Sequence, residues 1–215
     1  LKTPLQVIRG TLDRLPDADD AAERAEIAAQ IDRVIDQANA RVTSLMQLFR
    51  LEALAEIPMA DRLDLGVIAD GAVEDLADLL ETRGRTVRID LAPGVRVSGN
   101  RALLDLMVSN LLTNAQKYAP DGAAISVALE RRGAAFRLSV ANTGSSFPAD
   151  IRARAFERFA RARADADRPG SGIGLSLVRA IVERHGFSVE IPEIEGQAVV
   201  VIEGPCAPAR EGEQS

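Results

Sequence analysis

The sequence is poor in cysteine, aromatic residues and histidine, and each scarcity excludes a class of protein. A single cysteine, Cys206, cannot form an internal disulfide, which favours a reducing compartment. With no tryptophan and only 3% aromatic residues, the core must consist mainly of aliphatic side chains. A membrane-spanning helix needs about 20 apolar residues, and no such run occurs. The only histidine, His185, lies at the end of a predicted helix, where a cation would favourably meet the helix dipole, and we interpret it as structural.

The charge balance excludes a general nucleic-acid binder. The 215 residues carry a formal net charge of −6, and no broad basic surface is predicted that would neutralise phosphates. A hydrophobic content of 47% with 27% charged residues is typical of globular proteins. This length allows one large domain or two small ones.

The first part of the chain is predicted to be a helical hairpin. Apolar residues recur at helical spacing over residues 1–15 and again over residues 21–54. A hairpin with one apolar stripe on each helix cannot bury both stripes, whereas two hairpins paired in a four-helix bundle can. We therefore expect a homodimer; the alternative is that the hairpin folds back on its own second domain.

The periodicity is lost over residues 56–62, around Pro58, and a domain boundary is predicted there. The hairpin then comprises residues 1–57 and a second domain residues 58–203. Residues 204–215 are predicted to be a disordered tail, with Cys206 as an exposed thiol.

The second domain alternates between helix and strand patterns. Helices are predicted over residues 66–83, 101–118 and 174–185, and strands over 62–65, 86–91, 95–97, 124–130, 134–141, 188–191 and 197–203. Because the strands include hairpins, the sheet must be mixed. The predicted fold class is therefore α+β: a helical hairpin followed by an α/β sandwich with helices on one face of the sheet.

The helix predicted over residues 101–118 carries chemistry on one side. Asn110, Asn114 and Lys117, spaced four and three residues apart, lie along one stripe. Amide oxygens can hold a metal ion and the lysine can hold a phosphate. The alternative is an ordinary solvated face.

Further motifs follow in order along the chain. Asn142 opens N-T-G-S-S-F-P, and Gly170 opens G-S-G-I-G-L at the start of an apolar helix. Together with N-L-L-T-N-A-Q-K-Y, these resemble the N, G1 and G2 boxes of the ATP-binding domain of histidine kinases. F-E-R-F at residues 156–159 matches the F box, and L-K-T-P-L at residues 1–5 looks like the tail of the phosphoacceptor motif H-E-L-[KR]-T-P-L.

The resemblance implies roles for the matching positions in binding ATP and Mg²⁺. Asn114 and Asn110 would serve the metal ion, Lys117 a phosphate, and Tyr118 the base or ribose. Asn142 replaces the usual aspartate that accepts from the adenine amino group; its carbonyl oxygen can still accept if its NH₂ is directed elsewhere. The remaining cofactor-binding positions are those of the glycine-rich turns, the following helix and the lid, namely Gly144, Gly170, Gly172, Gly174, Leu175 and Arg161.

Three further expectations concern residues around these boxes. Ser146 replaces the second glycine of the G1 box and adds a Cβ where the backbone is expected to need positive φ. Phe156 and Phe159 are interpreted as core residues that anchor a lid containing Arg161. Thr3 would lie one helical turn after the phosphoacceptor, where its hydroxyl can orient a water for dephosphorylation of a partner.

The resemblance implies a two-component sensor kinase core. ATP would phosphorylate a histidine that the family places two residues before Leu1, and the phosphoryl group would pass to an aspartate on a response-regulator receiver domain. The core is expected in the cytoplasm, with the full-length protein anchored in the inner membrane through upstream segments. Two alternatives are a degenerate dimeric scaffold and an ATPase of the gyrase, chaperone and mismatch-repair group.

Overall fold

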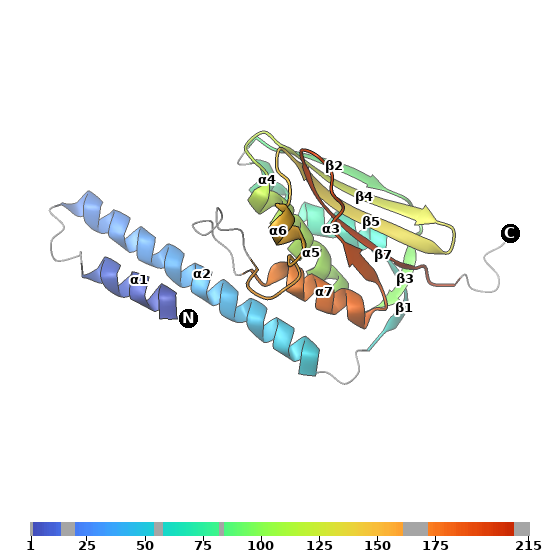
Figure 1. Cartoon of the computed structure of the whole chain (residues 1–215), viewed down its shortest axis with the longest axis horizontal. Helices are drawn as coiled ribbons and strands as arrows, with labels where there is room; N and C mark the ends of the chain where they lie inside the picture. The colour runs from blue at the N-terminus through green and yellow to red at the C-terminus, as the bar shows by residue number, and fades with distance from the viewer. Residues whose placement is uncertain (1, 14–19, 54–57, 82–83, 161–171, 209–215) are drawn as a thin grey trace.

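The structure is a computed structural model that describes residues 2–13, 20–53, 58–81, 84–160 and 172–208. The two predicted N-terminal helices are present as α1 (Lys2–Leu12) and α2 (Ala21–Ala53). Figure 1 shows them side by side, with α2 extending from the hairpin tip to the second domain. None of the described helices is long and apolar enough to cross a membrane.

The last turns of α2 pack against the second domain. Leu48 and Leu51 are 1% and 2% exposed and belong to the same core as the second domain, next to helix α7 (Gly174–Arg184). The sequence offered this folding back only as the alternative to a dimeric bundle. A second stripe of α2 stays exposed, however, at Ile35, Val42, Met46 and Phe49. One apolar stripe therefore serves the intramolecular contact, and another remains open.

The second domain contains the predicted mixed sheet. Its five strands have the order β2 (Thr86–Leu91), β4 (Ala124–Arg132), β5 (Ala135–Thr143), β7 (Gln197–Pro205) and β6 (Ser188–Glu190). Only β2 and β4 run parallel. Helices α3 (Leu65–Glu74), α5 (Arg101–Tyr118) and α7 cover one face of this sheet, as predicted (Figure 1).

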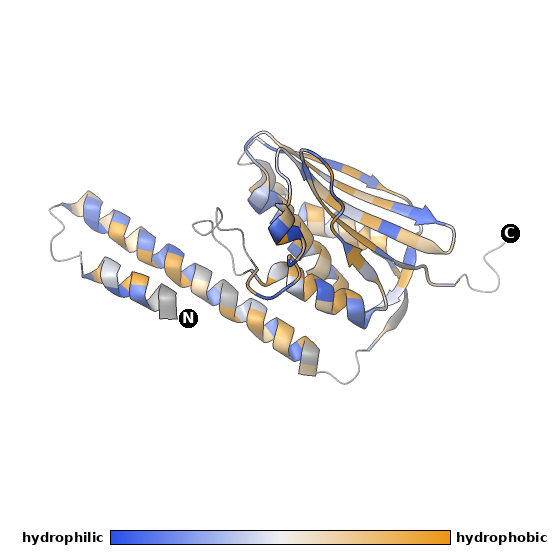
Figure 2. Cartoon of the chain, in the orientation of Figure 1, coloured by the Kyte–Doolittle hydropathy of each residue, from blue (hydrophilic) through white to orange (hydrophobic). Residues whose placement is uncertain are grey.

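The core lies between this helical layer and the sheet. Hydrophobic and hydrophilic residues alternate along the strands (Figure 2), and on β4 the inward set Ile125, Val127 and Leu129 is buried. The apolar stripe of α5 is buried as its spacing predicted, at Leu104, Met107, Val108, Leu111 and Leu112. Each such side chain contributes roughly 1.5–3 kcal/mol of transfer free energy, which fixes α5 against the sheet.

The segment predicted as one helix over residues 66–83 is instead two helices, α3 and α4 (Ala77–Glu81). Asp64 ends strand β1 (Ala60–Asp64) because its carboxylate accepts from the N–H groups of Gly66 and Val67 and so caps α3. The break follows from a tightened last turn, in which the Leu76 N–H bonds to the Val73 carbonyl.

The C-terminal segment is more ordered than predicted. Strand β7 continues to Pro205, and the N–H groups of Cys206 and Ala207 bond to the carbonyls of Ala134 and Arg96. Cys206 is partly buried against the core, so the expectation of an exposed thiol in a disordered tail was wrong there. Residues 209–215 lie outside the described residues.

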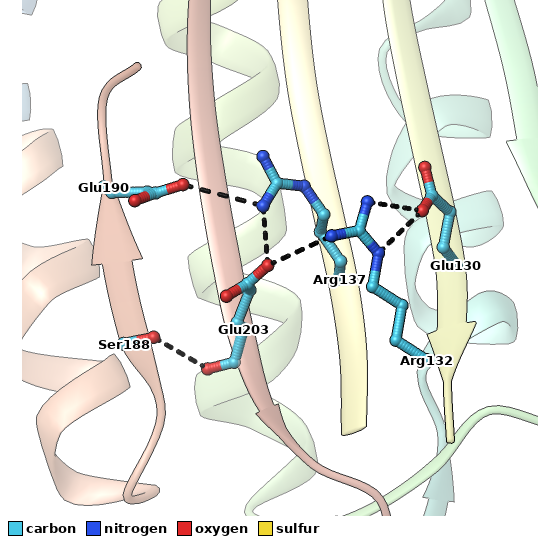
Figure 3. Close-up of polar contacts among 6 residues, drawn as sticks. All are labelled: Glu130, Arg132, Arg137, Ser188, Glu190 and Glu203. Carbon is cyan, nitrogen blue, oxygen red and sulfur yellow. Dashed lines mark hydrogen bonds and ion pairs between the residues drawn. The ribbon is translucent and has the colours of Figure 1, made fainter. Parts of the chain in front are cut away.

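The other face of the sheet carries a row of charged side chains across four strands. Arg137 contacts Glu203 at 2.6 Å and Glu190 at 3.6 Å, and Arg132 contacts Glu203 at 3.8 Å and Glu130 at 2.9 Å (Figure 3). Partly exposed pairs of this kind contribute little individually, about 0.2–1 kcal/mol each. They favour the observed pairing of β4, β5, β7 and β6.

Candidate nucleotide-binding site

The central element of the site is α5, whose start is fixed by a side-chain cap. Asn100 precedes the helix, and its Oδ1 accepts from the Leu103 N–H at 3.2 Å. With the apolar stripe of α5 buried, Asn110, Asn114 and Lys117 are left half-buried at the edge of the core. The predicted stripe of polar groups is therefore present on an immobilised helix.

Asn110 faces the start of helix α7. Its Nδ2 donates to the Leu106 carbonyl at 2.8 Å, which leaves Oδ1 to point away from α5. A Cβ at position 174 would lie 3.1 Å from this Oδ1, so Gly174 keeps open the space between the two helices. The structure thus brings together residues from the N and G2 boxes, which are 64 positions apart. An amide oxygen presented in this way suits a hard divalent cation.

Lys117 and Tyr118 contact each other at the C-terminal end of α5. The Lys117 Nζ lies 3.1 Å from the Tyr118 hydroxyl and 4.7 Å from the centroid of its ring. This cation–π arrangement holds the ammonium at the protein surface beside the aromatic ring.

Arg85, which sequence reasoning missed, fixes that end of α5. It is 7% exposed, and its guanidinium donates to the carbonyls of Ala119 at 2.6 Å and Pro120 at 3.2 Å. Asp121 lies 3.8 Å away. A single arginine at the start of a strand gave no signal, because its partners lie about 35 residues further along the chain.

The G1 turn packs directly on the residue that follows α5. Gly144 has φ of +76°, and a Cβ there would lie 2.7 Å from Pro120 Cγ, so glycine is needed on both counts. The Gly144 N–H also bonds to the Gly196 carbonyl at 2.9 Å. The path from Arg85 through Pro120 to Gly144 therefore links α5 to the G1 box.

Asn142 is 2% exposed and is oriented by a hydroxyl neighbour. Its Nδ2 donates to Ser145 Oγ at 2.6 Å, so the NH₂ is directed to Ser145 and Oδ1 is left as an acceptor. Sequence reasoning missed this role of Ser145, although a serine three residues after an asparagine is a common turn signal. Ser146 does not have positive φ, and the strain expected there is absent.

The ends of the predicted lid meet at its base. The Phe159 N–H donates to the Gly172 carbonyl at 2.8 Å, and Gly172 has φ of +69°. Phe159 is 60% exposed with φ of +63°, and Phe156 is half-buried, so the interpretation of Phe159 as a core residue was wrong.

Helix α7 begins directly after this base. Ile173 is fully buried at its N-cap position and has no side chain that can cap backbone N–H groups, and Leu175 packs partly against the core. The first N–H groups of α7 are therefore not capped by the Ile173 side chain, and uncapped helix N-termini are suited to anions. Arg161 and Gly170 lie outside the described residues, and so does the side chain of Thr3, which belongs to α1.

His185 closes the opposite end of α7 and is structural, but not as a cation. It is 7% exposed, with Nδ1 at 2.7 Å from the Ile181 carbonyl and Nε2 at 3.1 Å from the Asn100 N–H. Because Nε2 accepts, the proton must be on Nδ1. Burial lowers the pKa of His185, which favours the neutral ring.

A cavity of about 360 Å³ lies beyond the G1 turn, lined by residues such as Ser146, Arg152, Glu193 and Gln197. Two of its charged groups, Arg152 and Glu193, pair at 2.7 Å, and this pairing lowers the pKa of Glu193. Within the described residues, no cluster of three or more histidine, cysteine, aspartate or glutamate side chains could hold a metal ion. A cation at α5 would depend on asparagine oxygens, waters and phosphates.

Comparison with known proteins agrees with this geometry. Residues 99–207, more than half of the chain, match the family described as histidine kinase-, DNA gyrase B- and HSP90-like ATPase. The sensor protein QseC of Escherichia coli (strain K12) is 33% identical over 204 residues, covering 91% of this chain and 43% of that protein. The sensor-like histidine kinase SenX3 of Mycobacterium tuberculosis (strain H37Rv) is 28% identical over 197 residues, covering 89% and 47%. The chain thus spans less than half the length of these relatives.

The fold comparison extends over the hairpin. The crystal structure of histidine kinase ThkA in complex with response regulator protein TrrA has a TM-score of 0.78 at 18% identity, and the match covers 98% of this chain and 60% of that chain. At this identity the likeness concerns the fold alone. Because the family model matches more than half of its residues, the chain belongs to the histidine kinase-, DNA gyrase B- and HSP90-like ATPases.

Proposed function

We propose that this chain binds Mg²⁺ and ATP in its second domain and transfers the γ-phosphoryl group to a histidine just upstream of Leu1. The observation that carries the proposal is the approach of Asn110 Oδ1 to Gly174, which joins a candidate metal-binding oxygen to a candidate phosphate-binding helix N-terminus. When bound, Mg²⁺ would offset phosphate charge.

The chain's own residues would bind and orient the nucleotide. Asn114 and Asn110 would present amide oxygens to the cation, and the N–H groups that follow Gly172 and Gly174 would hold phosphate oxygens. Asn142 Oδ1 would accept from the adenine amino group, because its NH₂ is already bonded to Ser145. Lys117 would turn from the Tyr118 ring toward a phosphate, leaving the ring beside the base or ribose.

The remaining assigned positions complete the proposal. Gly144 would allow the G1 turn to approach the base, Leu175 would anchor the start of α7, and Gly170 and Arg161 would belong to the lid. Thr3 would serve dephosphorylation of the response regulator. The domain limits proposed from the sequence, residues 1–57 and 58–203, stand as part of this proposal.

We further propose that the chain is a homodimer and that its partner is a response-regulator receiver domain. The exposed stripe of α2, with Val7 and Leu12 of α1 also 41% and 47% exposed, supports pairing with a second hairpin. Support for the receiver domain is the ThkA structure, which was solved in complex with a response regulator. We expect the core in the cytoplasm and the full-length protein anchored in the inner membrane.

The scaffold alternative is not favoured. It depended on the replacements at Asn142 and Ser146. Ser146 does not have positive φ, and the Asn142 Oδ1 remains available as an acceptor because its NH₂ donates to Ser145. SenX3 is named a sensor-like histidine kinase and QseC a sensor protein, which also favours the kinase over other ATPases of the family.

Calorimetric titration with a non-hydrolysable ATP analogue, with and without Mg²⁺, tests the proposal. We expect Mg²⁺-dependent binding that Asn114→Ala weakens at least tenfold. Thr113→Ala is the matched control, because Thr113 is exposed on the same helix and its hydroxyl bonds only to the Ser109 carbonyl in the described contacts. Absence of binding at millimolar nucleotide, or equal weakening by both variants, would contradict the proposed site.

A further inference from the structure

Asn100 joins three parts of the molecule that are far apart in the sequence. Its side-chain Oδ1 caps α5, its backbone N–H donates to His185 Nε2 at the end of α7, and its Nδ2 donates to the Pro58 carbonyl at 3.0 Å. Pro58 lies in the connecting segment (residues 58–62), which follows α2 in the chain and includes the first residues of β1. One residue thus contacts both helices that bear the candidate nucleotide groups and the chain that leads to the hairpin.

The end of α7 is held rigidly against this residue. A Cβ at Gly99 would lie 2.9 Å from His185 Cδ2 and 2.9 Å from Leu104 Cδ1, so the ring and the backbone of β3 (Arg96–Gly99) are in close contact. The ring is fixed in turn by the Ile181 carbonyl. A displacement of Asn100 would therefore also displace the end of α7.

The connecting segment is held at a second point. Arg62 has φ of +64°, at an irregularity in the pairing of β1 with β3, and its Nη1 donates to the Pro208 carbonyl at 2.7 Å. Ala60 pairs with Gly99, directly before Asn100. Residues 58–62 are thus fixed to the second domain at several points and lie against the start of α5.

The start of α5 is connected to the nucleotide groups by the helix itself. Asn110 and Asn114 lie about 15–21 Å along the helix axis from Asn100, at about 1.5 Å per residue. Since the buried face of α5 packs as one body with the sheet, a tilt at its first turn moves these side chains. The same holds for α7, which starts at Gly174 and ends directly before His185.

We propose that Asn100 is a positioning residue that couples the connecting segment to the nucleotide site through its bond to the Pro58 carbonyl. It does not touch substrate; it sets the position of α5 and α7 relative to residues 58–62. This proposal rests on the proposed function, because the coupled site is the nucleotide site. By thermodynamic linkage, nucleotide bound at that site must in turn change the mobility of residues 58–62.

Amide hydrogen exchange of the intact chain, with and without a non-hydrolysable ATP analogue and Mg²⁺, tests the coupling. Asn100→Ser retains a side-chain oxygen that caps α5 but removes the donor to Pro58. Asn100→Asp also retains the cap and places a carboxylate against the Pro58 carbonyl. Asp105→Asn is the matched control, because it removes an exposed ion pair with Arg101 in the first turns of the same helix without touching the connecting segment.

Without nucleotide, Asn100→Ser is expected to raise exchange in residues 59–62 about fivefold, the effect of one lost neutral hydrogen bond, while residues 101–104 keep their protection. Asn100→Asp should raise exchange in residues 59–62 at least as much, and Asp105→Asn should leave that exchange unchanged. The proposed role of the bond to Pro58 would be overturned if Asn100→Ser left exchange in residues 59–62 unchanged, or if exchange rose equally in residues 101–104.

With nucleotide, the parent chain should gain protection in residues 59–62, and Asn100→Ser should bind the analogue without that gain. Binding of the analogue that leaves residues 59–62 unchanged in the parent chain would overturn the coupling. If the analogue does not bind the parent chain at all, the proposed function fails and the coupling to a nucleotide site with it. The nucleotide-free comparison then still decides whether Asn100 tethers the segment.

Discussion

Replacing Gly144 with alanine tests whether the G1 turn depends on its contact with the end of α5. At φ of +76° a Cβ costs roughly 1–2 kcal/mol in a left-handed conformation. The same Cβ would lie 2.7 Å from Pro120 Cγ, and relieving such an overlap costs about 1–3 kcal/mol more. We therefore expect Gly144→Ala to lower the free energy of unfolding by about 2–5 kcal/mol.

Gly133→Ala is the matched control for backbone strain. Gly133 has φ of +65° in the turn between β4 and β5, and a Cβ there would meet no atom within 4 Å. It should therefore cost only the roughly 1–2 kcal/mol of strain and leave nucleotide affinity unchanged. Urea denaturation measures both variants, and titration with an ATP analogue measures their affinity. Equal destabilisation by the two variants, or unaltered affinity in Gly144→Ala, would refute the role given to Pro120.

Three further predictions concern His185, the docking of α2 and Arg85. Because burial lowers the pKa of His185, the unfolded chain binds the extra proton first, so stability should fall as pH drops below about 6.5 and His185→Gln should lack that component in denaturant titrations; parallel pH profiles would contradict the neutral buried ring. Leu48→Ala should cost about 2–5 kcal/mol in urea denaturation and Arg50→Ala, which is exposed on the same helix outside the stripe proposed for the dimer, less than about 1 kcal/mol; similar costs would mean that α2 does not pack on α7. Arg85→Met should weaken binding of the ATP analogue severalfold in calorimetry, because the carbonyls at the end of α5 lose their donor. Arg85→Lys should restore part of the affinity, because it retains one donor. Unchanged affinity in both variants would leave Arg85 with a purely structural role.

The regular elements were predictable where local pattern and burial agree. The apolar spacing of α5 predicted both its limits and its buried face, and the glycine after α7 predicted its end. The three boxes could be placed in order from their residue types. Their convergence, shown by Asn110 and Gly174, follows from the sheet topology and is not visible in any single segment.

Other features depend on contacts that a sequence pattern does not encode. The apolar stripe of α2 fits either a second hairpin or α7, and spacing alone does not choose between them. Phe159 was misjudged because aromatic residues are scarce, and scarcity suggests burial, whereas its side chain is 60% exposed. Arg85 and Asn100 act through backbone carbonyls, whose partners have no sequence signature.

The most direct test of the central claim is where nucleotide binds on this chain. Amide resonances of the ¹⁵N-labelled chain, followed during titration with a non-hydrolysable ATP analogue and Mg²⁺, report each position separately. We predict the largest shifts at Asn110, Asn114, Asn142 and residues 172–175, with little change at Glu130 and Glu203 on the outer face of the sheet. Shifts centred instead on the cavity near Ser146 and Gln197, or none at saturating nucleotide, would contradict the site formed by α5, the G1 turn and α7.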